Sequence, residues 1–250
     1  MTNQRTLSIL NLLAFMGVIL VNTLANALPI NGKSTGAVSA EFENFFTPIG
    51  FTFAIWSLIY LSLLLFVGYQ FFPAARKSGV VKDIRFIFII NCMANMAWIY
   101  AWHYQFFELT LLLMLILLWS LVRINLTIVT HSWWAKFPFQ VYLGWICVAT
   151  IANIAVYFKY IGVSVSTDTE ILVAFVMMII AGALAILLTV KKTWIAASLA
   201  LAWGIFGLYR KQVLYFPEGS YYQWGCLLMV VMIIVVVVMN MLKRRNLLVK

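Results

Sequence analysis

The chain has 250 residues, of which 65% are hydrophobic and 10% charged, and its mean hydropathy is +1.01. One water-soluble core cannot hide that much apolar surface, so the composition excludes a soluble globular protein and predicts an integral membrane protein with the lipid bilayer as its first partner. The net charge of +10 does not predict nucleic-acid binding, because the basic residues are scattered at the ends of apolar segments and serve there as topology signals.

The apolar segments predict an all-α fold, a polytopic membrane helical bundle of about eight transmembrane helices. A spanning helix takes about 20 apolar residues, and long runs without alternation argue against a transmembrane barrel. Residues 25–27 resemble a signal-peptide cleavage site, but the apolar run before them is as long as a full span. The expected spans are approximately 7–28, 47–70, 84–103, 109–130, 137–158, 171–190, 193–209 and 221–242.

The distribution of charge supports this layout independently of hydropathy. If the N-terminus is cytoplasmic, 13 of the 17 Lys and Arg residues fall on the cytoplasmic side, as the positive-inside rule requires. Six of the seven acidic residues then fall on the other side. We therefore expect both termini in the cytoplasm, and a plasma-type membrane such as the bacterial inner membrane.

The expected spans lack the groups that ion coupling or hydrolysis would need. No Asp, Glu, Lys or Arg lies near the middle of a span, although pumps and proton relays usually need buried ionisable groups. His103 and His131 lie at helix ends on opposite sides of the membrane, so they cannot share a site. The three cysteines have no metal or redox spacing and are expected to be packing residues. The sequence therefore predicts no catalytic residues, no metal site and no firmly implied cofactor, and favours a protein that is not an enzyme.

Amide and aromatic side chains instead form stripes at helical spacing along four spans. The stripes, in chain order, are Asn22 and Asn26; Phe53, Trp56 and Tyr60; Asn91, Asn95, Trp98 and Trp102; and Tyr142, Trp145, Ala149 and Asn153, with Thr150 beside them. Any single member is better explained as a contact that joins two helices. The stripes together favour a ligand site, because adhesion alone rarely needs so many tryptophans on polar faces.

The depth of three residues favours one shared site. Trp56, Trp98 and Asn153 lie at similar distances from the outer ends of their spans, at about 1.5 Å per residue. The loop 29–47 is on the same side, where it would form a lid. The residues predict an aromatic pocket with a few uncharged hydrogen-bonding groups, suited to a flat or bulky amphipathic ligand.

Three of these segments resemble a known family. Residues 48–60 resemble the second-helix signature of the tryptophan-rich sensory protein/translocator protein (TspO/MBR) family, approximately P-x-W-x-F-x-x-V-W-x-x-L-Y. Residues 95–98 resemble its third-helix N-x-x-W, and residues 145–153 its fifth-helix W-x-x-x-A-T-x-x-N. The motifs occur in the expected order, and the resemblance covers residues 1–160. Gly50 and Phe53 depart from the signature at the expected mouth of the pocket.

The resemblance implies a TspO-like five-helix bundle over residues 1–160, followed by an additional three-helix transmembrane segment over 161–250. It also implies a ligand of porphyrin, haem or sterol type, bound in a pocket that the loop between the first two helices covers, and a homodimer. The extra helices would cover the surface that a five-helix member uses to dimerise. Carried over position by position, the ligand-binding candidates are Trp56, Tyr60, Asn95, Trp98, Trp145, Ala149, Thr150 and Asn153.

The leading hypothesis is thus a membrane sensor or carrier that binds a hydrophobic small molecule of tetrapyrrole or sterol type. A small-solute permease is the second hypothesis, although no internal repeat relates residues 1–130 to 131–250. A membrane adaptor without a small ligand, with its partner surface on the last three helices, is a further alternative.

Overall fold

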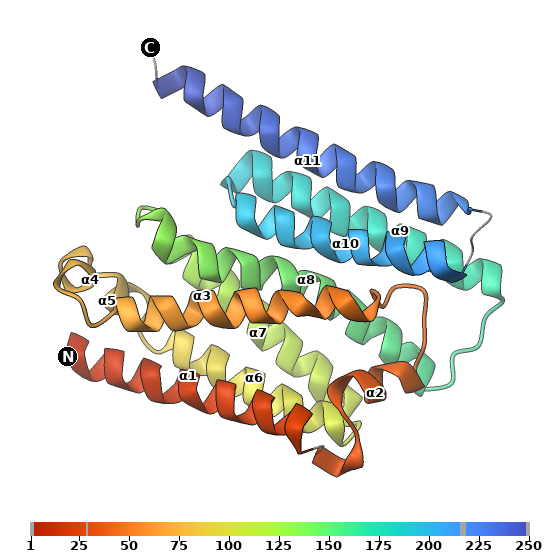
Figure 1. Ribbon diagram of the computed structural model, residues 1–250, viewed down its shortest axis with the longest axis horizontal. Coiled ribbons are helices and arrows are strands. Elements are labelled where there is room, and N and C mark those ends of the chain that lie inside the picture. Colours follow the sequence, from red (N-terminus) through yellow and green to blue (C-terminus); the bar gives the residue numbers. More distant parts are fainter. Residues whose placement is uncertain (1–2, 29, 216–218, 249–250) are drawn as a thin grey trace. The chain divides into compact units, whose positions relative to one another are not determined.

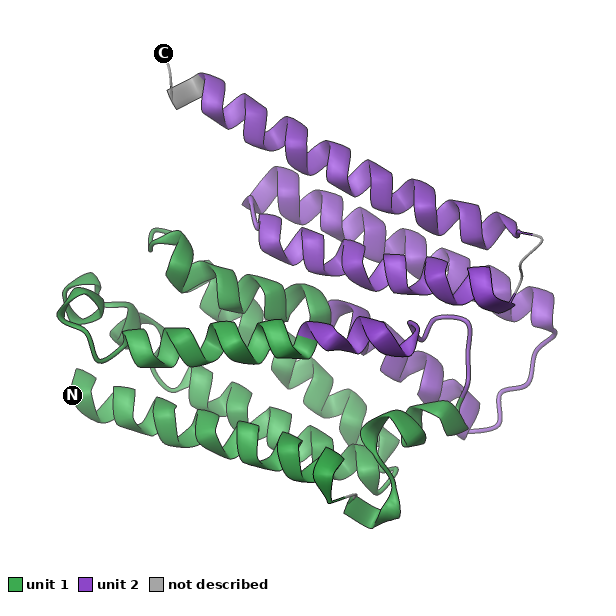
Figure 2. Cartoon of the chain, in the orientation of Figure 1, with its two compact units in different colours: residues 1–42, 56–146 green, residues 43–55, 147–250 purple. Residues whose placement is uncertain are grey.

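The computed structural model describes residues 3–28, 30–215 and 219–248, and over these residues the chain is helical with no strand. The expected all-α polytopic bundle is confirmed. Glu218 and Lys250, which enter the charge argument, lie outside the described residues. The chain divides into two compact units, residues 1–42 with 56–146 and residues 43–55 with 147–250 (Figure 2).

Unit 1 contains the first helices of the chain (Figure 1). Within it α1 packs along α6, and α6 packs along α7. Its elements are α1 (Gln4–Ala27), η1 (Ile30–Gly32), α2 (Thr35–Glu41), most of α3 (Ile55–Tyr69), α4 (Pro73–Ser78), α5 (Val80–Ile84), α6 (Ile87–His103), α7 (Phe107–Thr127) and the first half of α8 (Trp133–Tyr160).

Unit 2 contains the last three long helices, which pack against one another in pairs. It also takes in the segment 43–55 and the second half of α8 (Figure 2). Its other elements are η2 (Gly50–Ala54), α9 (Thr167–Leu187), the π-helical turn η3 (Leu188–Lys192), α10 (Ile195–Tyr215) and α11 (Tyr221–Leu248). The sequence predicts a boundary between two domains at residue 160. That boundary stays a prediction, because a compact unit is not the same as an independent domain.

Six helical segments within the described residues are long and apolar enough to cross a membrane. They contain α1, η2 with α3, α7, α8, α9 with η3, and α11. The other two expected spans are helices as well. Helix α6 has 17 residues, and α10 carries the basic pair Arg210 and Lys211 near its C-terminal end. All eight expected spans are long helices.

Local structure departs from the expected spans at their ends. The second span begins as η2, because the Thr52 hydroxyl donates to the Ile49 carbonyl at 2.6 Å and tightens the first turn. The short helix α2 was not expected. Ser34 begins it by accepting from the amide of Ala37, as an N-cap residue does. The basic linker after α3 folds into α4 and α5, which meet at Gly79 with a positive φ of 76°.

Candidate ligand-binding site

Four polar side chains form a continuous chain of hydrogen bonds in the interior of unit 1. Asn22 on α1 donates to Asn95 Oδ1 on α6 at 2.9 Å, and its own Oδ1 accepts from the Tyr60 hydroxyl at 2.9 Å. Asn95 in turn donates to the Tyr142 hydroxyl at 2.8 Å. The chain therefore ties together α1, α3, α6 and α8 with uncharged groups only, which suits the interior of a membrane bundle.

Trp56 lies beside this chain at the centre of an aromatic group. Its ring stacks on Tyr60 with a centroid separation of 5.3 Å and an interplanar angle of 22°. The rings of Tyr142 and Trp145 meet it edge to face at 5.7 and 6.3 Å. These are favourable geometries for aromatic pairs. Trp56 and Tyr60 are half-buried, whereas Tyr142 and Trp145 are fully buried. We call these four residues with Asn22 and Asn95 the aromatic–amide layer.

The layer follows from helical spacing on two of its elements. Trp56 and Tyr60 stand one turn apart on α3, and Tyr142 and Trp145 are three residues apart on α8, so each pair shares a face. Cys92 lies one turn before Asn95 on α6 and is buried. The layer therefore brings aromatic rings and neutral hydrogen-bond donors and acceptors together.

Four phenylalanines pack together in unit 1, between the aromatic–amide layer and the start of α1. Phe66 and Phe139 meet edge to face at 4.9 Å, and Phe88 contacts both at 6.4 and 5.7 Å. Phe15 stacks on Phe88 at 6.5 Å. None of the four is more than 2% exposed. We call this cluster the phenylalanine layer.

A buried amide pair lies beyond the phenylalanine layer, nearer the start of α1. Asn11 donates to Gln70 Oε1 at 3.0 Å, and both residues are at most 1% exposed. Along α1 the order is therefore Asn11, Phe15 and Asn22, at about 1.5 Å per residue. Polar groups thus stand on both sides of the phenylalanine layer.

The segment 30–41 is fixed over the C-terminal end of α6. The Trp102 indole donates to the Thr35 carbonyl at 3.1 Å, and His103 has its two ring nitrogens 3.1 Å from the Ile30 carbonyl and 3.0 Å from the Thr35 hydroxyl. Asn31 donates to the His103 carbonyl at 3.1 Å. This part of the expected lid is therefore held by defined contacts within unit 1.

Glu41 makes the hold on this segment sensitive to acid. Its carboxylate pairs with Lys33 at 2.7 Å and accepts from Gln105 at 2.8 Å. The hydrogen bond from Lys33, supported by Gln105, lowers the pKa of Glu41 from its ordinary value. A lowered pKa stabilises the folded segment above the pKa of the free group, and that contribution disappears as pH falls through the lower, folded value.

We therefore expect amide hydrogen exchange over residues 34–42, corrected for its intrinsic pH dependence, to be constant near neutral pH and to accelerate below about pH 4.5. The effect should be small because the pair is exposed to solvent. In Glu41→Gln the acid-dependent acceleration should be absent. Acceleration of equal size in parent and variant would contradict this role for Glu41.

The predicted site residues fall into three groups. The structure brings Trp56, Tyr60, Asn95 and Trp145 together in the aromatic–amide layer. Trp98 stacks on Trp102 at 5.1 Å, one turn further along α6 and nearer the segment 30–41. The remaining three lie on the half of α8 that belongs to unit 2, where the Asn153 side chain donates to the carbonyl of the preceding turn at 2.8 Å; they are Ala149, Thr150 and Asn153.

Sequence reasoning left Asn22 and Tyr142 out of the predicted site, although both belong to recognised stripes. In the structure they are the two links that join Tyr60 and Asn95. The sequence does not show which helix faces pack together, because a stripe defines one face of a helix but not the helix that it contacts. Among the described residues no group of three or more His, Cys, Asp or Glu side chains is placed to hold a metal ion.

Comparison with protein families agrees with the motifs. The family described as TSPO-like protein matches residues 8–242. The chain belongs to the TSPO-like protein family. The match runs from α1 into α11, so it includes the helices that the resemblance over residues 1–160 treated as additional. None of the curated proteins and none of the solved structures compared matches this TSPO-like protein.

Family membership and the apolar helices together establish an integral membrane protein of a sensor or carrier class. The aromatic–amide layer of this TSPO-like protein contains stacking rings, phenol hydroxyls and carboxamides. Such groups bind and orient a neutral or weakly polar ligand, and they supply neither a nucleophile paired with a base nor a charged carrier group.

Proposed function

We propose that this protein is a membrane sensor or carrier that binds a flat hydrophobic ligand, of tetrapyrrole or sterol type, at the aromatic–amide layer of unit 1. The observation that carries the proposal is the half-buried pair Trp56 and Tyr60, stacked in parallel beside a chain of uncharged hydrogen-bonding groups. Aromatic faces bind extended π systems and apolar rings, and the amides orient their few polar substituents.

The phenylalanine layer favours a binding site closed at one end over a continuous pathway. A permease for small polar solutes needs polar groups along its whole route, because a desolvated polar solute costs several kcal/mol in an apolar constriction. Here Phe15, Phe66, Phe88 and Phe139 separate Asn22 from the amide pair at Asn11. This arrangement supports ligand binding as the function, with permeation of small solutes as the second candidate.

The placement of the charged residues supports one orientation of the protein in the membrane. With both termini in the cytoplasm, 13 of 17 basic residues lie on that side, and the aromatic–amide layer lies between the phenylalanine layer and the outer surface. We propose a bacterial inner membrane as its location on this basis. The ligand would then enter from the outer side or from the outer leaflet.

Binding of protoporphyrin tests the function directly. Purified protein in lipid nanodiscs should show saturable quenching of tryptophan fluorescence that ends at one porphyrin per chain. Empty nanodiscs of the same lipid correct for partitioning into the bilayer. Quenching that rises linearly without saturation, for protoporphyrin and for a fluorescent sterol alike, would overturn the proposal. Liposome uptake of small solutes at rates above protein-free vesicles would support the permease instead.

A further inference from the structure

The segment 43–55 is fastened to α10 and α11 through its own backbone. Within unit 2, four hydrogen bonds join backbone groups of this segment to the two helices. They run from Lys211 Nζ to the Asn44 carbonyl at 2.9 Å, from the Tyr222 hydroxyl to the Phe45 carbonyl at 3.1 Å, from the Ile49 amide to the Gly207 carbonyl at 3.4 Å, and from the Trp203 indole to the Thr52 carbonyl at 2.8 Å.

One face of α10 provides most of this contact. Trp203, Gly207 and Lys211 follow each other at intervals of four residues and so lie on one side of the helix. Gly207 allows the closest approach, because an added Cβ would collide with the Thr52 side chain and lie 2.9 Å from the Pro48 Cβ. We call these three residues the docking face.

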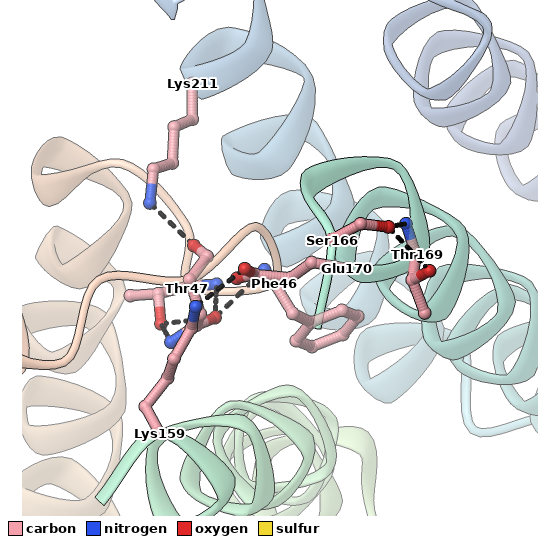
Figure 3. Close-up of polar contacts among 8 residues, drawn as sticks. Phe46, Thr47, Lys159, Ser166, Thr169, Glu170 and Lys211 are labelled. Atoms are coloured by element: carbon pink, nitrogen blue, oxygen red, sulfur yellow. Dashed lines mark hydrogen bonds and ion pairs between the residues drawn. The ribbon is translucent and has the colours of Figure 1, made fainter. Parts of the chain in front are cut away.

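The segment presents a rigid turn to this face. Asn44 Oδ1 accepts from the amides of Phe46 and Thr47 at 3.0 and 2.9 Å, which fixes the turn locally. Figure 3 shows Lys211 reaching toward this turn, and on the neighbouring helices the ion pair of Lys159 with Glu170 at 2.6 Å. Lys211 is only 8% exposed. Its ammonium group contacts the Asn44 carbonyl and the Glu43 carboxylate, which is 3.6 Å away.

Buried backbone carbonyls need partners, and here the C-terminal helices supply them. Helices α10 and α11 therefore complete the segment that leads into α3. The last residue of the fastened segment is Ile55, which is the first residue of α3 and the neighbour of Trp56. Because a helix is stiff over its first turns, the position of η2 determines where the Trp56 ring stands.

We infer that the docking face of α10 is a positioning site, which holds the segment 43–55 and thereby sets the placement of Trp56 and the rate at which ligand leaves. The inference rests on the proposed function for its effect on ligand. Its structural part, the hold on the segment, is independent of any ligand. Trp203, Gly207 and Lys211 are thus positioning residues for the ligand site, and the C-terminal helices are its control element.

The experiment compares two glycines in similar surroundings. Gly207→Ala places a methyl group against Thr52, whereas Gly182→Ala places one against Met229, between α9 and α11. Both are made with Thr52 unchanged, because its side chain is what the methyl group of Gly207→Ala meets. The measurements are the rate of amide hydrogen exchange over residues 43–55, read by mass spectrometry, and the dissociation rate of protoporphyrin.

Gly207→Ala should raise both the exchange rate and the dissociation rate about tenfold, and Gly182→Ala should change neither by more than about twofold. If Gly207→Ala does not fold, Trp203→Phe removes the donor to the Thr52 carbonyl, keeps an aromatic ring beside Phe51, and should shift both rates in the same direction. The exposed Trp224→Phe is its control. A parent that binds no porphyrin or sterol overturns the proposed function. Unchanged hydrogen exchange over residues 43–55, or a parent that binds with unchanged dissociation in Gly207→Ala and Trp203→Phe, overturns this inference.

Discussion

Trp56→Ala should weaken protoporphyrin binding by about 30-fold, equivalent to about 2 kcal/mol, because a central tryptophan commonly carries that much of a binding free energy. Trp56 is the half-buried ring that contacts Tyr60, Tyr142 and Trp145. Its removal takes away the stacking surface and leaves its three neighbours without a common partner. The dissociation constant from quenching titrations in nanodiscs measures the effect.

Two further variants separate stacking from a general loss of structure. Trp119→Ala removes a tryptophan that is 51% exposed on α7 and should leave the dissociation constant within about twofold of the parent value. Trp56→Phe keeps an aromatic ring and should weaken binding by an intermediate amount. Equal affinity in the parent and Trp56→Ala, or equal weakening by the Trp119 variant, would remove Trp56 from the site.

Asn95→Ala should lower both stability and affinity, because Asn95 bonds to two partners in the aromatic–amide layer. Its loss leaves Asn22 with the Val18 carbonyl as its remaining acceptor and takes away the amide that donates to the Tyr142 hydroxyl. Hydrogen bonds between membrane helices contribute about 0.6 kcal/mol each, and orphaned buried groups add to the cost, so we expect about 1–2 kcal/mol. The apparent Tm in detergent should fall by a few degrees, and protoporphyrin affinity should fall about tenfold.

Asn91→Ala is the matched control on the same helix. Asn91 lies one turn before Asn95, is equally buried, and donates to Ser120 at 2.8 Å on α7. It should lower the Tm by a similar amount and leave ligand affinity unchanged, because Ser120 is outside the aromatic–amide layer. If both variants lose affinity in proportion to stability, the amides serve only to hold helices together. That result would support the adhesive interpretation of the stripes.

Much of the fold is readable from sequence because a membrane span is a local property. Runs such as residues 221–242 are apolar over the length that a bilayer requires, and each expected span is a long helix. Short elements were missed because they are not determined by local composition alone. Helix α2 has seven residues, and it depends on the Ser34 cap and on contacts with α6 rather than on its own composition.

The candidate site was readable in part. Spacing on one helix predicted that Trp56 and Tyr60 share a face, and the structure adds that Asn22 and Tyr142 connect this face to Asn95. The attachment of residue 52 to residue 203 could not be predicted, since it joins positions 151 residues apart through a backbone carbonyl. Every residue has the same backbone carbonyl, so the amino-acid sequence of the segment does not indicate which carbonyls accept such hydrogen bonds.

Photoaffinity labelling tests the central claim, that ligand binds at the aromatic–amide layer of unit 1. The protein in nanodiscs is irradiated with a diazirine-bearing sterol, with and without excess protoporphyrin, and the adducts are mapped by mass spectrometry. The account predicts adducts on the peptides that carry Trp56 and Trp145, suppressed by protoporphyrin and reduced in Trp56→Ala. Adducts confined to lipid-facing residues such as Leu65 and Met239, unchanged by the competitor, would contradict it.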